Sequence, residues 1–553
     1  MMNDPKGSIW RKWDLHVHTP ASIINNYSDP DPWERFIRGL EKLPPEFKVI
    51  GVNDYLFIDG YRRLLSEKEN GRLTNIDLLL PVIELRIDKF GGTTGHLSRV
   101  NYHIIFSDDI KPDIIEQQFL NALPKEYIIS PQYNDLKTKW NALPTKQSLE
   151  DLGKLIIESV PEEERDKFYH PLIEGFNNLC IGLDTIKEAL QSHYFEGKYL
   201  TAVGKTEWAD IKWTDQSIAE KKTIINSADL VFISAESVEA WEKAKKSLTD
   251  AKVNDHLLDC SDAHSFSDAE YKDRIGKCFT WIKADTTFEG LMQIIHEPED
   301  RVSIVNTPEK LVHVQNNKTK HIKSIHIKRK AGATLSEIWF DNKLPFNPGL
   351  VAIIGNKGKG KSALSDIIGL LCDTKQYKDF TFLSEANFRQ PAYNKAQYFE
   401  AELTWESDIS ISRGLDDGVD LQKPELVKYI PQHFLEKICN QLPETEESEF
   451  DQELKKVIFS HVDQADRLDT TTLDELLAQK TSEAYRTIEI LKQELHEINE
   501  AIVLLEERLR PENKERINNL LDQKKKELET LIKSPPEPVS KPETDPAKQK
   551  KIA

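Results

Sequence analysis

Short apolar runs alternate with charged, helix-like stretches over roughly the first 300 residues. Apolar runs bounded by polar segments are typical of buried strands, and strands that alternate with helices are typical of a parallel α/β sheet. Closure of such a sheet into a barrel would bury all of its strands. The predicted strands are residues 8–16, 48–53, 78–84, 100–106, 199–204, 229–234 and 257–262. A polar, mostly helical insertion is predicted at 107–198.

The pattern changes beyond residues 297–302, where a Lys-, His- and Asn-rich stretch precedes a new apolar strand predicted at 349–355. This change indicates a boundary between two folded domains. The sequence therefore predicts a barrel domain (1–305), a second α/β domain (306–472), a coiled coil (473–533) and a disordered tail (534–553). The tail contains five prolines, which do not favour a packed core.

The coiled coil is predicted from large aliphatic residues at alternating spacings of three and four, the a/d rhythm of heptads. These positions are Ile488, Leu491, Leu495, Ile498, Ile502, Leu505 and Leu509. Pro511 interrupts the pattern, and Ile517, Leu521, Leu528 and Leu531 continue a looser repeat. Because only three heptads are regular, an ordinary amphipathic helix in a bundle stays open as an alternative.

Composition narrows the class of protein. The 553 residues carry a net charge of −19 with 39 % hydrophobic residues, which fits several folded domains and gives no general attraction to nucleic acid. Five scattered cysteines without a C-x-x-C pair fit a reducing cytoplasm. The chain has no apolar run long enough for a membrane span and no signal peptide, so we expect a cytoplasmic protein without a membrane partner.

A phosphate-binding loop is predicted where the spacing G-x-x-x-x-G-K-S follows the apolar run and precedes a helical pattern. Its glycines let backbone N–H groups surround phosphates, the lysine reaches the outer phosphates and the serine ligates Mg²⁺. ATP and Mg²⁺ are therefore the expected ligands. The expected nucleotide-binding residues are Gly355, Asn356, Lys357, Gly358, Gly360, Lys361, Ser362 and Ala363.

A candidate metal centre is predicted at the ends of the strands in the first domain. His16 and His18 are two residues apart in a predicted strand, so both imidazoles point to one face. Other strand ends carry further potential ligands, namely Asn53, Asp54, Glu84, His103, Glu207, Ser234, Glu236, Asp262 and His264. Mixed histidine and carboxylate ligands suit Zn²⁺, Mn²⁺ or Fe²⁺. A lone H-x-H pair is more often structural, so the prediction depends on the whole set.

The segments "DLHVHTPAS" and "CSDAHS" resemble the first and last motifs of the PHP (polymerase and histidinol phosphatase) superfamily. The resemblance implies a distorted (β/α) barrel that hydrolyses phosphoester bonds with two or three metals. It also implies that His16, His18, Glu84 and Asp262 form one metal site and that Glu84 and His103 begin a second, with His264 in the last motif. Three positions depart from the family. Ile24 and Tyr55 stand where histidines are expected, and Lys205 or Glu207 stands where a histidine is expected after the fifth strand. We therefore expect one or two metals rather than three. A degenerate, inactive barrel therefore stays open.

The second domain is similar to the ATPases of the ABC and SMC-like class. Gln432, after the predicted strand in "LVKYIPQ", resembles their Q-loop glutamine, which would contact Mg²⁺ and the attacking water. The second lobe of that class is not found before Ala553, so three alternatives stay open: the chain is truncated, a homodimer or another protein supplies the lobe, or the ATPase is incomplete. Whether this chain hydrolyses ATP alone stays open.

The combination resembles the TrlF-like family of PHP-ATPases, across roughly the first 450 residues. The resemblance implies a metal-dependent phosphodiesterase or nuclease regulated by ATP, in a family whose genes often lie near phage-defence or mobile-element genes. Its catalytic and metal-binding residues would be His16, His18, Glu84, His103, Asp262 and His264. The alternatives are an ATP-dependent scaffold that binds nucleic acid or a partner, and a small-molecule phosphatase. The sequence does not distinguish DNA from RNA as the substrate.

Overall fold

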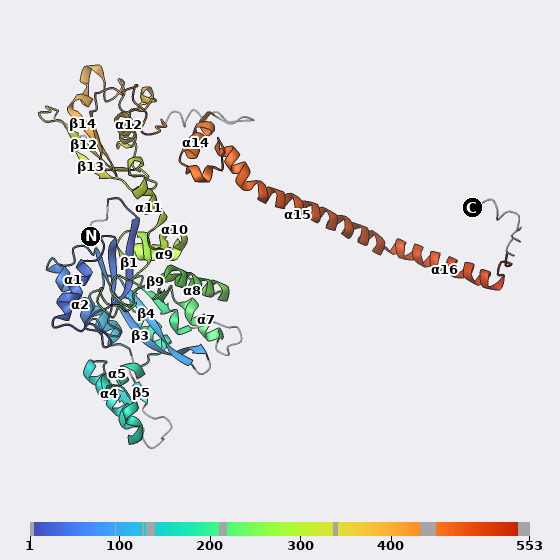
Figure 1. Ribbon diagram of the computed structural model, residues 1–553, viewed down its shortest axis with the longest axis horizontal. Coiled ribbons are helices and arrows are strands. Elements are labelled where there is room, and N and C mark those ends of the chain that lie inside the picture. Colours follow the sequence, from blue (N-terminus) through green and yellow to red (C-terminus); the bar gives the residue numbers. More distant parts are fainter. Residues whose placement is uncertain are drawn as a thin grey trace, which may run out of the picture. The chain divides into compact units, whose positions relative to one another are not determined.

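The computed structural model describes residues 5–93, 96–123, 126–128, 139–208, 218–335, 341–431 and 449–539. The chain divides into two compact units, Met1–Val427 and Lys428–Ala553. The first unit contains a large mixed sheet with surrounding helices and a smaller antiparallel sheet, and the second unit is helical (Figure 1).

The large sheet has nine strands in the order β11-β10-β1-β2-β3-β4-β7-β8-β9. The strands are β1 (Ile9–His18), β2 (Phe47–Asn53), β3 (Leu78–Thr93), β4 (His96–Phe106), β7 (Tyr199–Gly204), β8 (Leu230–Ile233), β9 (Leu257–Asp259), β10 (Thr280–Ala284) and β11 (Val302–Ile304). All seven predicted strands of the first domain are therefore confirmed. The strands β10 and β11 are not among the predicted ones. β10 pairs antiparallel with β1 on one side and with β11 on the other.

Among the seven predicted strands, the prediction of a parallel sheet is wrong at one. β4 runs antiparallel to both of its neighbours, β3 and β7, while β1–β2–β3 and β7–β8–β9 are parallel. The reason is that β3 and β4 continue directly into one another as a long hairpin, without the crossover helix that a parallel pair requires. The direction of β4 decides how His103 reaches the candidate site.

The two ends of the sheet approach one another, so that it is nearly closed into a barrel. The segment after β9 forms a parallel bridge between Val17 and Ala263, and the N–H of His18 donates to the carbonyl of Ala263 at 3.0 Å. The N–H of Ser261 also donates to Asp14 Oδ1 at 3.0 Å. These contacts bring the last motif of the barrel beside the first, although about 245 residues separate them.

A β-bulge in β1 determines which side chains enter the barrel. Trp13 and Leu15 pack in the same interior cluster as Phe232, and the ring of His16 also lies against Phe232, so the alternation of faces breaks after Leu15. The pairing with β2 shifts by one residue at this point, as expected for a bulge. Gly51 of β2 lies opposite, and a Cβ there would come within 2.4 Å of the Leu15 carbonyl oxygen.

Helices surround the large sheet, and Figure 1 shows α1 and α2 on one side of it and α7 and α8 on the other. Apolar side chains of these helices, among them Phe36, Tyr61 and Leu248, pack with the outward-facing strand residues in the larger core cluster. The helices that follow strands of the sheet are α1 (Pro32–Glu41), α2 (Asp59–Glu69), α7 (Ile218–Ser227), α8 (Val238–Ala251), α9 (Phe288–His296), α10 (Pro298–Arg301) and α11 (Glu309–Asn316).

The insertion between β4 and β7 is mostly helical, as predicted, and it also contains one pair of short strands. Its elements are α3 (Pro112–Ile114), η1 (Ile115–Leu120), β5 (Glu126–Ile128), β6 (Lys139–Asn141), α4 (Lys146–Glu158), η2 (Glu162–Lys167), α5 (Pro171–Asn178) and α6 (Leu183–Leu190). Helices α4 and α5 pack so closely that Cβ atoms at Gly153 and Gly175 would overlap backbone atoms of the facing helix. The insertion therefore has a packed structure of its own.

The smaller sheet has the antiparallel order β13-β12-β14-β15, formed by β12 (Ile322–Arg329), β13 (Asn342–Pro345), β14 (Phe399–Trp405) and β15 (Ser410–Gly414). Helix α12 (Lys361–Leu371) packs on β14 and β15. The prediction of a strand at 349–355 is wrong. These residues form no strand, and the side chains of Leu350 and Ile354 are 99 % and 90 % exposed. An apolar run becomes a strand only beside a pairing partner, and none of the described strands lies next to this run.

The second unit contains α14 (Glu449–Ser460), α15 (Leu473–Leu509) and α16 (Pro511–Lys533). The predicted helix and its interruption at Pro511 are confirmed. All seven a/d residues of α15 are 44–80 % exposed, so the described residues contain no bundle that covers them. Coiled-coil pairing itself stays a prediction. Among the described residues, no helix combines the length and low polarity needed to cross a membrane.

We predict that Gly51→Ala destabilises the barrel by about 1–3 kcal/mol, because the added methyl group would overlap backbone atoms of Leu15 rather than a side chain that can turn away. The measurement is the unfolding midpoint of the purified chain in denaturant. Gly39→Ala is the matched control, because a Cβ at Gly39 of α1 would make only ordinary contacts, the nearest at 3.6 Å. Equal midpoints for the two variants would contradict the close approach at Gly51.

Candidate functional site

The centre of the site lies at the end of β1, where the bulge turns His16 and His18 into the barrel. Both residues are buried, and their Nε2 atoms lie 3.0 Å apart. The prediction that the two imidazoles share one face is confirmed. Two ring nitrogens at this distance require a proton or another cation between or beside them, because two lone pairs facing one another repel.

Glu84 and His103 approach the histidines from the neighbouring strands. They are paired residues in the antiparallel register of β3 and β4, and Glu84 Oε2 lies 3.2 Å from His16 Nε2 and 3.7 Å from His103 Nε2. The sequence predicts both residues at the ends of their strands. In the structure, each of them lies within its strand. His103 reaches the site from the middle of β4 because that strand runs in the opposite direction.

Asp262 completes the group from the segment after β9. Its Oδ1 lies 3.3 Å from His16 Nε2 and 3.6 Å from His18 Nε2. Asp262 has a φ of 48°, in the left-handed region that non-glycine residues rarely adopt. This backbone conformation accompanies a carboxylate that points back into the barrel.

The side chains form two groups with ligand atoms within 4.8 Å of one another, one of His16, His18 and Asp262 and one of His16, Glu84 and His103. His16 belongs to both groups. The donor set fits a divalent metal, because it combines imidazole nitrogen with carboxylate oxygen. His103 Nε2 is buried and has no hydrogen-bond partner among the described residues, and a metal would satisfy it.

His264 lies in the site but differs from the other predicted ligands. Its ring stacks on that of His18 with centroids 4.0 Å apart. Its Nδ1 is 2.7 Å from the carbonyl oxygen of Asp262, and its Nε2 is 2.9 Å from the hydroxyl of Tyr55. Both ring nitrogens are therefore engaged within the protein, and Tyr55 holds the ring from the position where the family motif has a histidine.

Two further strand-end residues, Asn53 and Asp54, lie in the site, although neither belongs to the set of expected catalytic and metal-binding residues. Asn53 Nδ2 donates to Glu84 Oε2 and also lies 2.7 Å from His16 Nε2. Asp54 accepts hydrogen bonds from Thr19 and Ser22, and the hydroxyl of Ser22 also lies 3.0 Å from His18 Nδ1. The sequence signal was "VND" at the end of a buried strand, beside the strand that carries the two histidines.

The charges of the site depend on burial and on the two carboxylates. Burial alone lowers the pKa of His16, but Asp262 and Glu84 outweigh it and raise the pKa to about 9. Burial lowers the pKa of His18 and of His103 to about 4. Burial acts to raise the pKa of Glu84, yet the hydrogen bond and charge of the surrounding histidines hold it well below its usual range. The group therefore favours one positive charge at its centre.

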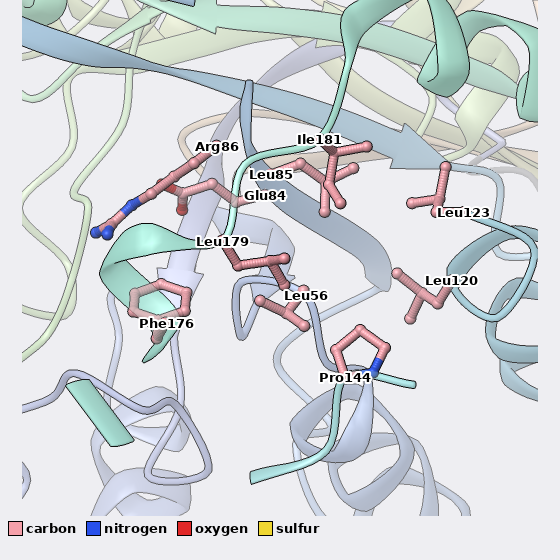
Figure 2. A pocket seen from close by; sticks show the side chains of 10 residues that line it. All are labelled: Leu56, Glu84, Leu85, Arg86, Leu120, Leu123, Pro144, Phe176, Leu179 and Ile181. Carbon is pink, nitrogen blue, oxygen red and sulfur yellow. The ribbon is translucent and has the colours of Figure 1, made fainter. Parts of the chain in front are cut away.

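The histidines open into a cleft that is also lined by Arg86, Asn101, Thr206 and Lys272. The guanidinium of Arg86 stacks over the ring of Phe176 at 4.4 Å, so the insertion helps to position it. Figure 2 shows Glu84 and Arg86 beside an apolar pocket, where Leu56 faces Leu179 and Phe176 of the insertion. This packing joins the insertion to the strand that carries Glu84. The described residues do not include the side chain of Glu207.

The predicted phosphate-binding loop has part of the expected geometry. Gly358 and Gly360 have φ angles of 82° and 93°, and Gly360 is the N-cap of α12 without a side-chain cap. Asn356 and Lys357 are exposed, Ser362 is half-buried and Ala363 is buried. Lys361 Nζ donates to the carbonyl oxygens of Gly355 and Asn356 at 2.6 and 3.0 Å, so the lysine folds back over the loop.

The predicted Q-loop finds no support. Gln432 lies outside the described residues. The strand expected to precede it is wrong, because residues 426–431 form no strand, and Leu426 and Ile430 are 45 % and 38 % exposed. As at 349–355, the apolar run has no strand beside it among the described residues.

Comparisons with known proteins give little. No family model matches the sequence, and the search of curated proteins finds no match. One similar solved structure is that of a "putative metal-dependent phosphoesterase" from Bifidobacterium adolescentis, with 10 % identity and a TM-score of 0.27, covering 52 % of this chain and 96 % of that chain. A metal site in this chain is therefore inferred from the geometry of its own residues.

We predict that the purified chain binds Mn²⁺ or Zn²⁺ and that His16→Ala weakens this binding by at least about 100-fold, because His16 is shared by both ligand groups. His103→Ala should abolish metal binding only at the group of His16, Glu84 and His103. The group of His16, His18 and Asp262 stays intact and should still bind one ion. Elemental analysis after dialysis and calorimetric titration measure both effects. His193→Ala, at an exposed histidine, is the control. Unchanged binding in His16→Ala would refute the assignment.

Proposed function

We propose that the barrel is a metal-dependent phosphoesterase that cleaves phosphodiester bonds in nucleic acid. The observation that carries this proposal is the convergence of His16, His18, Glu84, His103 and Asp262, whose Nε2 and carboxylate oxygens lie 3.0–3.7 Å apart in a cleft open to solvent. A divalent metal held by these residues would act as a Lewis acid toward a phosphoryl oxygen and lower the pKa of a water molecule.

The other residues of the cleft support a phosphate substrate. Arg86 and Lys272 line the same space as the five clustered side chains, and each offers N–H donors to the non-bridging oxygens of a phosphodiester. Such donors offset the negative charge that develops on phosphorus-bound oxygens during attack by water. We do not count His264 among the metal ligands, because both of its ring nitrogens already have partners within the protein.

We further propose that the loop 355–363 binds ATP with Mg²⁺ and that this binding regulates the barrel. The left-handed glycines and the uncapped N-terminus of α12 support phosphate binding. In the TrlF-like interpretation, a homodimer or another protein supplies the second ATPase lobe, Gln432 contacts the nucleotide and the protein acts in the cytoplasm. The proposed role in phage or mobile-element defence rests on the family resemblance alone.

A second function is favoured by one observation. Tyr55 stands where the family has a histidine and holds His264 by its hydroxyl group. The site therefore has fewer available ligands than its relatives, which fits a non-catalytic barrel in an ATP-dependent scaffold that binds nucleic acid or a partner. Measured hydrolysis separates the two functions.

We predict that the chain with Mn²⁺ hydrolyses bis(p-nitrophenyl) phosphate and cleaves DNA or RNA. Asp262→Asn should lower kcat/KM by about 100-fold or more, because the amide neither ligates metal well nor offsets the charge on His16. Asp268→Asn is the control, since this exposed carboxylate pairs with Arg35 outside the cleft. Metal binding without any hydrolysis by the wild type would favour the scaffold, and preference for p-nitrophenyl phosphate would indicate a small-molecule phosphatase.

For the loop, we predict that Lys361→Ala lowers ATP affinity by at least about tenfold, because in the G-x-x-x-x-G-K-S spacing this lysine is the residue that reaches the outer phosphates. Calorimetric titration with ATP and Mg²⁺ measures the change. Lys375→Ala removes an exposed lysine beyond the end of α12 and should leave the affinity unchanged. Equal ATP affinity in both variants would contradict nucleotide binding at this loop.

A further inference from the structure

Helix α15 presents an apolar stripe that no described residue covers. Its seven a/d residues, from Ile488 to Leu509, are 44–80 % exposed, whereas Leu476 near the start of the helix is buried beside α14. A continuous stripe of large aliphatic side chains in solvent is unusual and marks an interaction surface. The regular heptads identify another helix as the kind of partner that fits it.

The neighbouring helix of the same chain does not fit. Only Arg510 separates α15 from α16, and the two helices continue end to end rather than folding back on one another (Figure 1). The heptad positions of α16 are also interrupted, because Lys524 falls where an apolar core residue is required between Leu521 and Leu528. The partner helix must therefore come from outside this pair.

We propose that α15 pairs with α15 of a second copy of this chain, in an antiparallel coiled coil with its twofold axis near residue 500. In this register each apolar residue of the stripe from Leu491 to Leu509 meets another one. The layers pair Leu491 with Leu509, Leu495 with Leu505, and Ile498 with Ile502, each of them twice by symmetry.

The charges beside the stripe favour this arrangement. In an antiparallel pair, g positions face g positions and e positions face e positions. The register brings Glu494 against Arg508 and Lys492 against Glu506, and symmetry doubles both ion pairs. At the axis, two small residues meet, Ala501 of one copy against Ala501 of the other. No like charges oppose one another within the apolar overlap.

Other arrangements lack this complementarity. In a parallel pair in register, g residues face e residues of the next heptad, which brings Glu494 against Asn499 and Ala501 against Glu506. Neither is an ion pair. Sliding the antiparallel register by one heptad opposes Glu494 to Ala501 or to Glu515, so the ion pairs are lost or replaced by repulsion. Charge thus selects both the direction and the register of the helices.

The first test is the mass of the full chain by sedimentation velocity without nucleotide, over a wide range of concentrations. We expect a dimer that Ile498→Lys dissociates, because the change puts an ammonium group into a central layer. Ile490→Lys is the matched control, since Ile490 is 51 % exposed, close to the 56 % of Ile498, but lies off the stripe. A chain that stays monomeric, a dimer that survives Ile498→Lys or a dimer that forms only with ATP would overturn the proposal.

The second test is charge exchange, which reports on direction. Glu494→Lys and Arg508→Glu should each raise the dimer dissociation constant by at least about tenfold, because each puts like charges together twice. The double variant should restore the wild-type constant. Ala501→Cys should form a disulfide-linked dimer on oxidation, and Gln493→Cys, on the outer face of α15, should form none. Failure of the double variant to restore pairing would overturn the antiparallel register. These tests are independent of the proposed hydrolysis, since none of them changes the barrel.

Discussion

The backbone of Leu15 lies so close to β2 that only glycine fits opposite, because a Cβ at Gly51 would meet the Leu15 carbonyl oxygen at 2.4 Å. This close approach accommodates the bulge in β1, and the bulge reverses which side chains face inward. Without it, strict alternation would place His16 on the face opposite to Leu15. The whole candidate site depends on this reversal, since His16 is the residue common to both ligand groups.

The electrostatics of the site follow from the same burial. At neutral pH the shifted pKa values leave Glu84 and Asp262 ionised, His16 protonated, and His18 and His103 neutral. Two negative charges and one positive charge leave a net charge of −1, and both ring nitrogens of His103 are buried without a hydrogen-bond partner among the described residues. A divalent cation would displace the proton of His16 and neutralise both carboxylates. The single positive charge on His16 thus does not balance the two carboxylates, whereas the charge of a divalent cation would.

The sequence predicted the strands of the barrel well, because each is a short apolar run between polar segments. It predicted the site in part, since His16, His18, Glu84, His103 and Asp262 do come together. It could not predict the direction of β4 or the bulge in β1, because hydrophobic periodicity carries no information on strand direction or pairing register. The partners of Asn53 and Tyr55 depend on these features. The same limit explains the error at 349–355, where an apolar run lacks a neighbouring strand.

The hydrogen bonds of Asp54 also bear on how the protein is activated. This buried carboxylate holds Thr19 and Ser22, and Ser22 in turn orients His18, so the first turn after β1 is fixed by the protein itself. The pairing of β3 with β4 fixes Glu84 and His103 in the same manner. A metal site that the fold positions in this way would not need its ion in order to fold, unlike small zinc domains that fold only around their ion. The supply of metal, rather than synthesis of the chain, would then set how many barrels are competent.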